Sequence, residues 1–287
     1  MSRRAAAIKK DLLEITTIED LTSVFESIAS IRISKIKNKV IASKQFFSDL
    51  WSIYTLLRAD PSERLAGVKR RVRKGEKSKA FIVITSEGGL TGDIDERIIS
   101  EVVRDYDPTT TDIIVVGDHG VKLLAQHKIQ VTKFFKTPDS ASYVDVTPMI
   151  GSVEDYEQIT AYYETYVSLS VQETAHIDLI AAVRSIGDEL GLEEGTISSR
   201  DYVFEPSLPE IIQYLETTMI SLALSQVILE SKLAQDASRF NAMNAAKEKA
   251  KELVGEYRTT FNRARRSEAD GRLKEVIVSM NNAEGVA

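Results

Sequence analysis

The fold is decided by the stretch that begins at Ser207 and reads SLPEIIQYLETTMISLALSQVILESKLAQDASRF, ending at Phe240. Pro206 and Pro209 mark the start of a helix, and no proline follows them in the rest of the sequence. Apolar residues recur mostly at steps of three, four or seven, at Ile211, Leu215, Leu222, Leu229, Leu233, Phe240, Met243, Ala250, Tyr257 and Phe261. A helix of roughly seventy residues would be on the order of 100 Å long, so its apolar stripe needs a partner.

The first 58 residues supply a candidate partner for this helix. Apolar residues at helical spacing include Ile8, Leu12, Ile15, Leu21, Phe25 and Ile28, and no proline or glycine occurs before Pro61. Two long amphipathic helices favour an antiparallel coiled coil of the two termini. We expect Leu21, Phe25 and Ile28 to form its seam with Phe240 and Met243. The alternative is two separate surface helices on an α/β core.

The residues between these helices change character twice. Residues 59–79 are rich in lysine and arginine and form a basic connector, which is either a solvated linker or a contact for an acidic partner or lipid headgroups. Residues 80–204 are typical of an α/β domain, because AFIVIT (80–85) and DIIVVG (112–117) are short continuous apolar runs, like buried parallel strands. Helices are expected at 93–106 and 121–126, and further strands at 129–135, 177–183 and 197–204. The resulting fold class is α/β, a long antiparallel coiled coil (1–58 and 205–287) with an inserted Rossmann-like domain (80–204).

Bulk properties exclude several classes of site. The 287 residues carry a net charge of −6, which argues against general nucleic-acid binding by the chain. The absence of cysteine rules out disulfides and thiolate metal sites. His119, His127 and His176 are too scattered to predict a metal cluster. The sequence has no run of about twenty apolar residues, so we expect no membrane-spanning segment.

The sharpest local motif is TSEGGLTGDID at 85–95, which follows the first strand and opens a helix. A phosphate loop would lie at such a place, but the motif lacks the Gly-Lys-Ser/Thr ending and the Gly-x-Gly-x-x-Gly pattern. Its acidic residues Glu87, Asp93 and Asp95 would repel phosphate. We therefore interpret it as a tight strand-to-helix turn and expect no cofactor there.

No catalytic constellation stands out either. Asp118-His119-Gly120 follows a strand end, where α/β active sites occur, but no nucleophile accompanies it in the sequence. In the last helix, Arg258, Arg263, Arg265 and Arg266 cluster around Asn262, followed by Glu268. This cluster is either a soluble face with i,i+4 ion pairs or a ring of charge that meets an acidic loop of a surrounding protein.

Three blocks of the sequence resemble the gamma subunit of rotary ATP synthases. The first is Leu21-Thr22 with Ile28-Ala29 and Arg32, and the second is EGGLTGDID at 87–95, which is similar to the family's Asp-Arg-Gly-Leu-Cys-Gly-x-x-Asn. The third combines Glu205-Pro206, Glu230, RFNAM (239–243), FNRARR (261–266) and EVI (275–277). The order and spacing of these blocks cover nearly the whole chain. Arg266, Ala269-Asp270 and Ser279-Met280 depart from the family pattern, so the resemblance is to a divergent member.

The resemblance implies a central rotor shaft, which couples ion flow through a membrane ring to ATP synthesis or hydrolysis on surrounding subunits. It implies as partners the alpha and beta subunits of the catalytic hexamer, the epsilon subunit and the membrane c-ring, at the cytoplasmic face of the cell membrane. Arg263, Arg265, Arg266 and Glu268 would then contact the beta subunits, and the chain itself would be non-catalytic and hold no nucleotide. Two alternatives remain open: a nucleotide-binding α/β enzyme with helical arms, and a purely structural coiled-coil protein.

Overall fold

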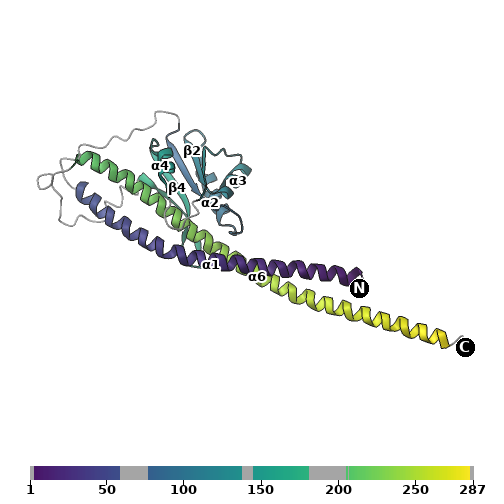
Figure 1. Cartoon of the computed structure of the whole chain (residues 1–287). Helices are drawn as coiled ribbons and strands as arrows, with labels where there is room; N and C mark the ends of the chain where they lie inside the picture. Colours follow the sequence, from purple (N-terminus) through teal and green to yellow (C-terminus); the bar gives the residue numbers. More distant parts are fainter. Residues whose placement is uncertain (1–2, 59–76, 138–144, 181–204, 206, 285–287) are drawn as a thin grey trace. The chain divides into compact units, whose positions relative to one another are not determined.

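The computed structural model describes residues 3–58, 77–137, 145–180, 205 and 207–284 (Figure 1). Its chain forms two compact units, one made of Met1–Ile28 with Phe240–Ala287 and the other of Ala29–Arg239. Two long helices, α1 (Arg3–Arg58) and α6 (Leu208–Glu284), contribute to both units. Each unit is described below by itself.

The unit 29–239 contains a five-stranded sheet. Its strands are β1 (Lys79–Ile84), β2 (Thr111–Val116), β3 (Lys133–Phe135), β4 (Gln158–Tyr166) and β5 (Gln172–Asp178), and their order is β3-β2-β1-β4-β5. The first four strands are parallel, and β5 pairs antiparallel with β4. The helices α2 (Ile94–Asp105), α3 (Asp118–Gln126) and α4 (Thr147–Val153) connect the strands. The parallel sheet and the two terminal helices confirm the predicted fold class.

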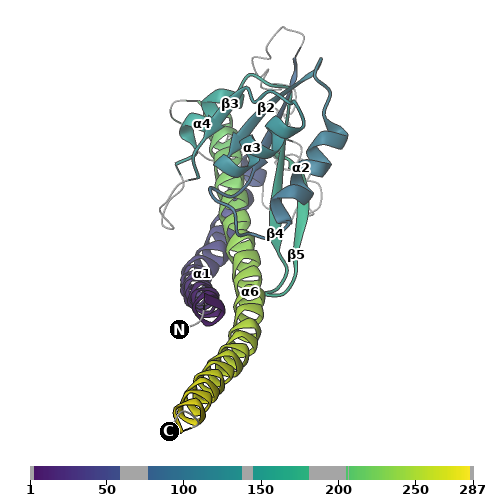
Figure 2. The same cartoon turned by 90° about the vertical axis from the view of Figure 1, so that its right-hand side faces the viewer.

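The sheet separates two hydrophobic cores, because successive side chains of a strand point to opposite faces. Phe81 and Val83 of β1 pack with α2 and α3, while Ile82 and Ile84 pack with α4 and with the first half of α6. Figure 2 shows α2 and α3 on one face of the sheet and α6 on the other. Burial of both faces explains why β1 and β2 are continuously apolar in sequence.

The helices α1 and α6 run antiparallel, as predicted. In the unit 29–239, Arg32 faces Asp236 at 3.9 Å, and the end of α1 lies beside the start of α6 (Figure 1). In the other unit, Nζ of Lys247 lies 2.7 Å from Oε2 of Glu26. Ile36 and Val40 of α1 are buried in the same core as Leu229 and Leu233 of α6, so an apolar seam joins the helices there.

Several boundaries differ from the sequence expectations. A strand was predicted at 177–183, but β5 ends at Asp178 and the chain turns helical at Leu179. Pairing with β4 sets the position of β5. This pairing begins at Gln172, so the strand starts and ends earlier than the apolar run at 177–183 predicts. The third strand is shortened to three residues from the predicted 129–135. The predicted strand at 197–204 and most of the basic connector lie outside the described residues.

One part of α6 is apolar enough, by length and composition, to cross a membrane, with a mean hydropathy of 1.2 over its most apolar window. The sequence, which has no run of about twenty apolar residues, predicts no such segment. Met219, Leu224 and Ile228 in this part of the helix are fully buried against the sheet. Packing in the core therefore accounts for part of the apolarity of this helix.

Candidate functional site

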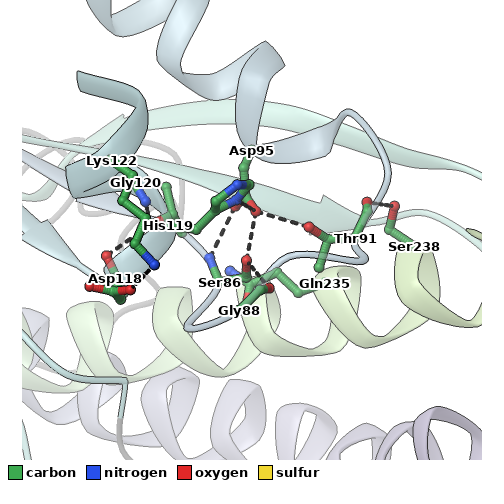
Figure 3. A network of polar contacts seen from close by, with 12 residues as sticks. Ser86, Gly88, Thr91, Asp95, Asp118, His119, Gly120, Lys122, Gln235 and Ser238 are labelled. Carbon is green, nitrogen blue, oxygen red and sulfur yellow. Dashed lines mark hydrogen bonds and ion pairs between the residues drawn. The ribbon is translucent and has the colours of Figure 1, made fainter. Parts of the chain in front are cut away.

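The loops at the carboxyl edge of the sheet meet in a buried polar network. Asp95, in the first turn of α2, is 1% exposed and accepts hydrogen bonds from the two loops around it. Its carboxylate lies 3.0 Å from the backbone N of Ser86, 2.7 Å from Ser86 Oγ and 2.9 Å from Thr91 Oγ1. Nδ1 of His119, at the start of α3, lies 2.8 Å from the same carboxylate (Figure 3). Asp95 therefore joins the loops that follow β1 and β2.

The electrostatics of Asp95 follow from these contacts. Burial by itself raises the pKa of a carboxyl, but hydrogen bonds from Ser86, His119 and Thr91 outweigh it and lower the pKa of Asp95. The carboxylate is therefore charged at neutral pH. It also lies at the N-terminus of α2, where an anion is favoured by the helix dipole.

Asp95 competes with any anion that would bind after β1. The backbone N–H of Ser86, which could help to hold an anion there, already donates to this carboxylate, and the negative charge of Asp95 repels phosphate. The interpretation of residues 85–95 as a strand-to-helix turn agrees with this geometry. Gly92 adopts a φ of +68°, in the left-handed region that favours glycine, and its tight turn brings the loop next to Ser238 of α6.

The Asp118-His119-Gly120 segment has a structural part in the same network. His119 contacts Asp95, while the backbone N of Gly120 donates to Thr85 Oγ1 at 3.0 Å. The Ser86 hydroxyl contacts Asp95 and lies 2.8 Å from the Gly88 carbonyl, so serine and histidine share one carboxylate. A catalytic triad needs the base to contact the nucleophile and the acid to orient the base. This arrangement does not provide that relay.

A second buried carboxyl, Glu164, lies on β4 beside this network. Gln235 Nε2 of α6 donates to its Oε2 at 3.1 Å, and the hydroxyl of Ser231 donates to the same oxygen. Burial, and after it the nearby charge of Asp95, raises the pKa of Glu164 well above its ordinary value. Its Oε1 is buried and has no hydrogen-bond partner among the described residues. Burial therefore favours the neutral form of Glu164.

The helix α6 covers the crevice where α/β sheets commonly bind ligands. The strand order reverses between β1 and β4, and that crevice opens at their carboxyl ends. Ser231 and Gln235 contact Glu164 there, and Ser238 Oγ donates to the Thr91 carbonyl at 2.6 Å. These three side chains occur at steps of four and three on the buried face of α6. This spacing of polar residues is the only sign in the sequence that α6 contacts Glu164 and the loop containing Thr91, and it was not used to predict the contact.

The charged residues predicted as a partner site lie in the other unit. Arg263, Arg265 and Arg266 are exposed on α6. Within the described residues no ion pair of these arginines is recorded. Glu268 is half-buried and pairs with Arg272 at 2.7 Å, one turn further along the helix. The three arginines therefore present uncompensated charge, while Glu268 has a partner within its own helix.

The predicted seam residues of α1 lie mostly outside the contact between the helices. Leu21, Phe25 and Ile28 are 52%, 39% and 40% exposed. The covered face of α1 in this unit instead follows Ile8, Leu12, Ile15, Glu19, Thr22 and Glu26. Glu19, Thr22 and Glu26 on this face are polar. A prediction from apolar residues alone therefore placed the seam one residue away along α1. On α6, Met243 is buried and Phe240 is half-buried.

Among the described residues, no group of three or more His, Asp and Glu side chains could hold a metal ion.

The chain is similar to known proteins over nearly its whole length. A family model described as ATP synthase matches residues 4–282. The ATP synthase gamma chain of Ureaplasma urealyticum is 22% identical over 286 residues, which span 94% of this chain and 97% of that relative. The ATP synthase gamma chain of Dehalococcoides mccartyi is 24% identical over 281 residues, spanning 94% of this chain and 95% of the relative.

Solved structures share the fold. A chain from the central stalk and c-ring of the Tetrahymena thermophila mitochondrial ATP synthase aligns with a TM-score of 0.60 at 18% identity, over 79% of this chain and 99% of that chain. A chain of the Euglena gracilis mitochondrial enzyme aligns with a TM-score of 0.55 at 14% identity, over 87% of this chain and 93% of that chain. Matched by the family model from residue 4 to residue 282, this chain belongs to the ATP synthase family, as a divergent relative of its gamma chains.

Proposed function

We propose that this chain is the central rotor shaft of a rotary ATP synthase or ATPase. The observation that carries the proposal is the antiparallel pairing of α1 and α6, helices of 56 and 77 residues, with the sheet inserted between them in sequence. Two intertwined helices resist bending because they share a seam. A shaft of this kind transmits rotation from a membrane ring, driven by ion flow, to ATP synthesis or hydrolysis on surrounding alpha and beta subunits.

The buried network explains how the sheet is fixed to such a shaft. Ser231, Gln235 and Ser238 of α6 contact Glu164 and the loop that contains Thr91. Polar groups buried in this way must keep their partners, because leaving one unpaired costs about 1–3 kcal/mol. The sheet is therefore fastened to α6 by directional contacts as well as by the apolar core. This fastening supports transfer of torque between the sheet and the helices.

The surface of the helices in the unit 1–28 with 240–287 suits contact with surrounding subunits. Arg263, Arg265 and Arg266 offer positive charge to acidic loops of the beta subunits, and Glu268 lies beside them. Leu21, Phe25 and Ile28 form an exposed apolar stripe on α1, which we assign to contact with the inner wall of the alpha and beta ring. An apolar surface with few charged groups allows rotation without locking.

The rest of the assignment follows from the rotor role. In this role the chain is a non-catalytic subunit, and the charge of Asp95 beside the loop after β1 disfavours a phosphate there. The α/β domain of residues 80–204 would contact the epsilon subunit and the c-ring. The helical parts 1–58 and 205–287 would form the shaft. The whole subunit would be peripheral, at the cytoplasmic face of the cell membrane.

The test is the double variant Arg265→Ala with Arg266→Ala in the assembled complex. We expect alpha and beta subunits to co-purify with it from native membranes, and the coupled ATPase rate to fall. Lys251→Ala, which changes another exposed basic residue of α6, is the matched control and should leave the rate unchanged. Unchanged coupled turnover in the double variant would show that the two arginines are only a solvated face. Failure of alpha and beta subunits to co-purify with the unaltered chain would refute the rotor role.

A further inference from the structure

A pocket of about 270 Å³ lies at the carboxyl edge of the sheet, between α1, α6 and two strand-end loops. Glu87 follows β1, and Thr137 follows β3, so both loops enter the pocket from the edge where α/β sheets bind ligands. All lining residues belong to the unit 29–239. The volume is slightly below the range of about 300–1,000 Å³ for drug-sized ligands, and it leaves room for a phosphate group.

Basic side chains outnumber acidic ones in this basic pocket. The basic residues are Arg32, Lys35, Lys232 and Arg239, and the acidic ones are Glu87 and Asp236. The carboxylate of Asp236 lies 2.6 Å from Arg239 and 3.9 Å from Arg32. The charge of Lys232 acts on the same carboxylate. The carboxylate of Asp236 thus faces three cations, and Lys35 adds a fourth basic side chain to the lining.

Thr137 gives independent evidence that a ligand fits the pocket. The residue is 8% exposed and lines the pocket, and its hydroxyl Oγ1 has no hydrogen-bond partner among the described residues. Buried hydroxyl groups are paired in the large majority of cases, because an unpaired one costs free energy. A hydroxyl at the edge of a basic pocket can donate to an oxyanion, which would satisfy it.

Glu87 sets a limit on the affinity of this pocket. Its Oε1 accepts a hydrogen bond from the backbone N of Thr137, which holds the carboxylate at the pocket wall. A carboxylate in this position repels an incoming anion. Removing its charge while keeping its acceptor oxygen should therefore strengthen anion binding.

We propose that the basic pocket binds a phosphate group, either as inorganic phosphate or as part of a nucleotide. Guanidinium groups such as those of Arg32 and Arg239 fit the oxygens of a phosphate group in pairs, and the ammonium group of Lys35 adds positive charge. The bound group would join α1 to α6 and to the loop after β3. This site is separate from the start of α2, which Asp95 occupies.

Isothermal titration of the purified full chain with inorganic phosphate at low salt tests the proposal, with ATP and ADP in parallel arms. We expect saturable binding of phosphate. Equal or weaker binding of the nucleotides would assign the site to free phosphate, and tighter nucleotide binding that phosphate displaces would assign it to a nucleotide. Absence of saturable heat with all three ligands would overturn the proposal.

Four variants locate the site. Thr137→Val should weaken phosphate binding about tenfold, because it removes one hydrogen bond to a charged group. Lys35→Gln changes an exposed side chain that the fold does not need, and should weaken binding about threefold. Glu87→Gln should tighten binding. Lys37→Gln, on the same helix but outside the pocket lining, is the control, and equal affinities for it and Lys35→Gln would refute the assignment.

Discussion

Replacing Asp95 with alanine removes the carboxylate that holds the strand-end loops together. Asp95 takes part in four hydrogen bonds, to Ser86 N, Ser86 Oγ, Thr91 Oγ1 and His119 Nδ1. Its side chain is 1% exposed, so solvent does not replace the lost acceptor. We therefore expect Asp95→Ala to destabilise the unit 29–239 strongly.

The magnitude follows from the contacts. A hydrogen bond to a charged group contributes about 1.5–3 kcal/mol. The burial cost of the carboxylate, which alanine does not carry, offsets part of the sum. The expected net loss in the free energy of unfolding is about 3–5 kcal/mol, because the buried partners of Asp95 are left without it and each unpaired buried group costs about 1–3 kcal/mol. Urea unfolding of the purified full chain, followed by circular dichroism, measures this loss.

Asp93→Ala is the matched control, because Asp93 lies on the same turn but its side chain is 73% exposed. Its ion pair with Arg97, at 3.5 Å, is a surface pair, so the change should cost at most about 0.5 kcal/mol. Asp95→Asn, which keeps one acceptor oxygen and removes the charge, should fall between the two. If Asp95→Ala costs no more than Asp93→Ala, the network does not hold these loops and the reasoning fails.

Three further changes test other parts of the structure by urea unfolding. Glu164→Gln should stabilise the chain at about pH 8 but not at about pH 4. Burial raises the pKa of Glu164, so the stability that depends on its neutral form is lost as the pH rises. An equal effect at both pH values would contradict this. Gly117→Ala should cost about 2 kcal/mol or more, since its Cβ would lie 2.1 Å from the Thr85 carbonyl oxygen at a φ of +103°, and a neutral outcome would exclude that close approach. Met243→Ala should cost about 2–3 kcal/mol, while Leu21→Ala should cost much less, and similar losses would place Leu21 in the seam after all.

Apolar periodicity was the signal that could be followed over long stretches. The strands at AFIVIT and DIIVVG lie where their apolar runs predicted, because both faces of these strands are buried and residues 80–84 and 113–116 are all apolar. The strands β4 and β5 were harder to place. β5 carries polar and half-buried residues at the sheet edge, and its pairing partner β4 defines its start.

The polar contacts could not be predicted in the same way. Asp95, Glu164 and Gln235 are separated by 69 and 71 residues along the chain and meet only when α6 packs across the sheet edge. A carboxylate gives no sign in the sequence of whether it will be solvated or buried. Asp93 and Asp95 illustrate this, since one is exposed and the other is fully covered.

The sequence by itself determined that the two termini are long helices, that an α/β domain lies between them and that the chain is related to ATP synthase gamma chains. These properties depend on local spacing, which repeats along the chain and can be read residue by residue. Only the tertiary structure decided which face of α1 forms the seam, and that α6 rather than a ligand fills the crevice between β1 and β4. Those outcomes depend on which groups distant in sequence are excluded from water together, and local spacing carries no information about that.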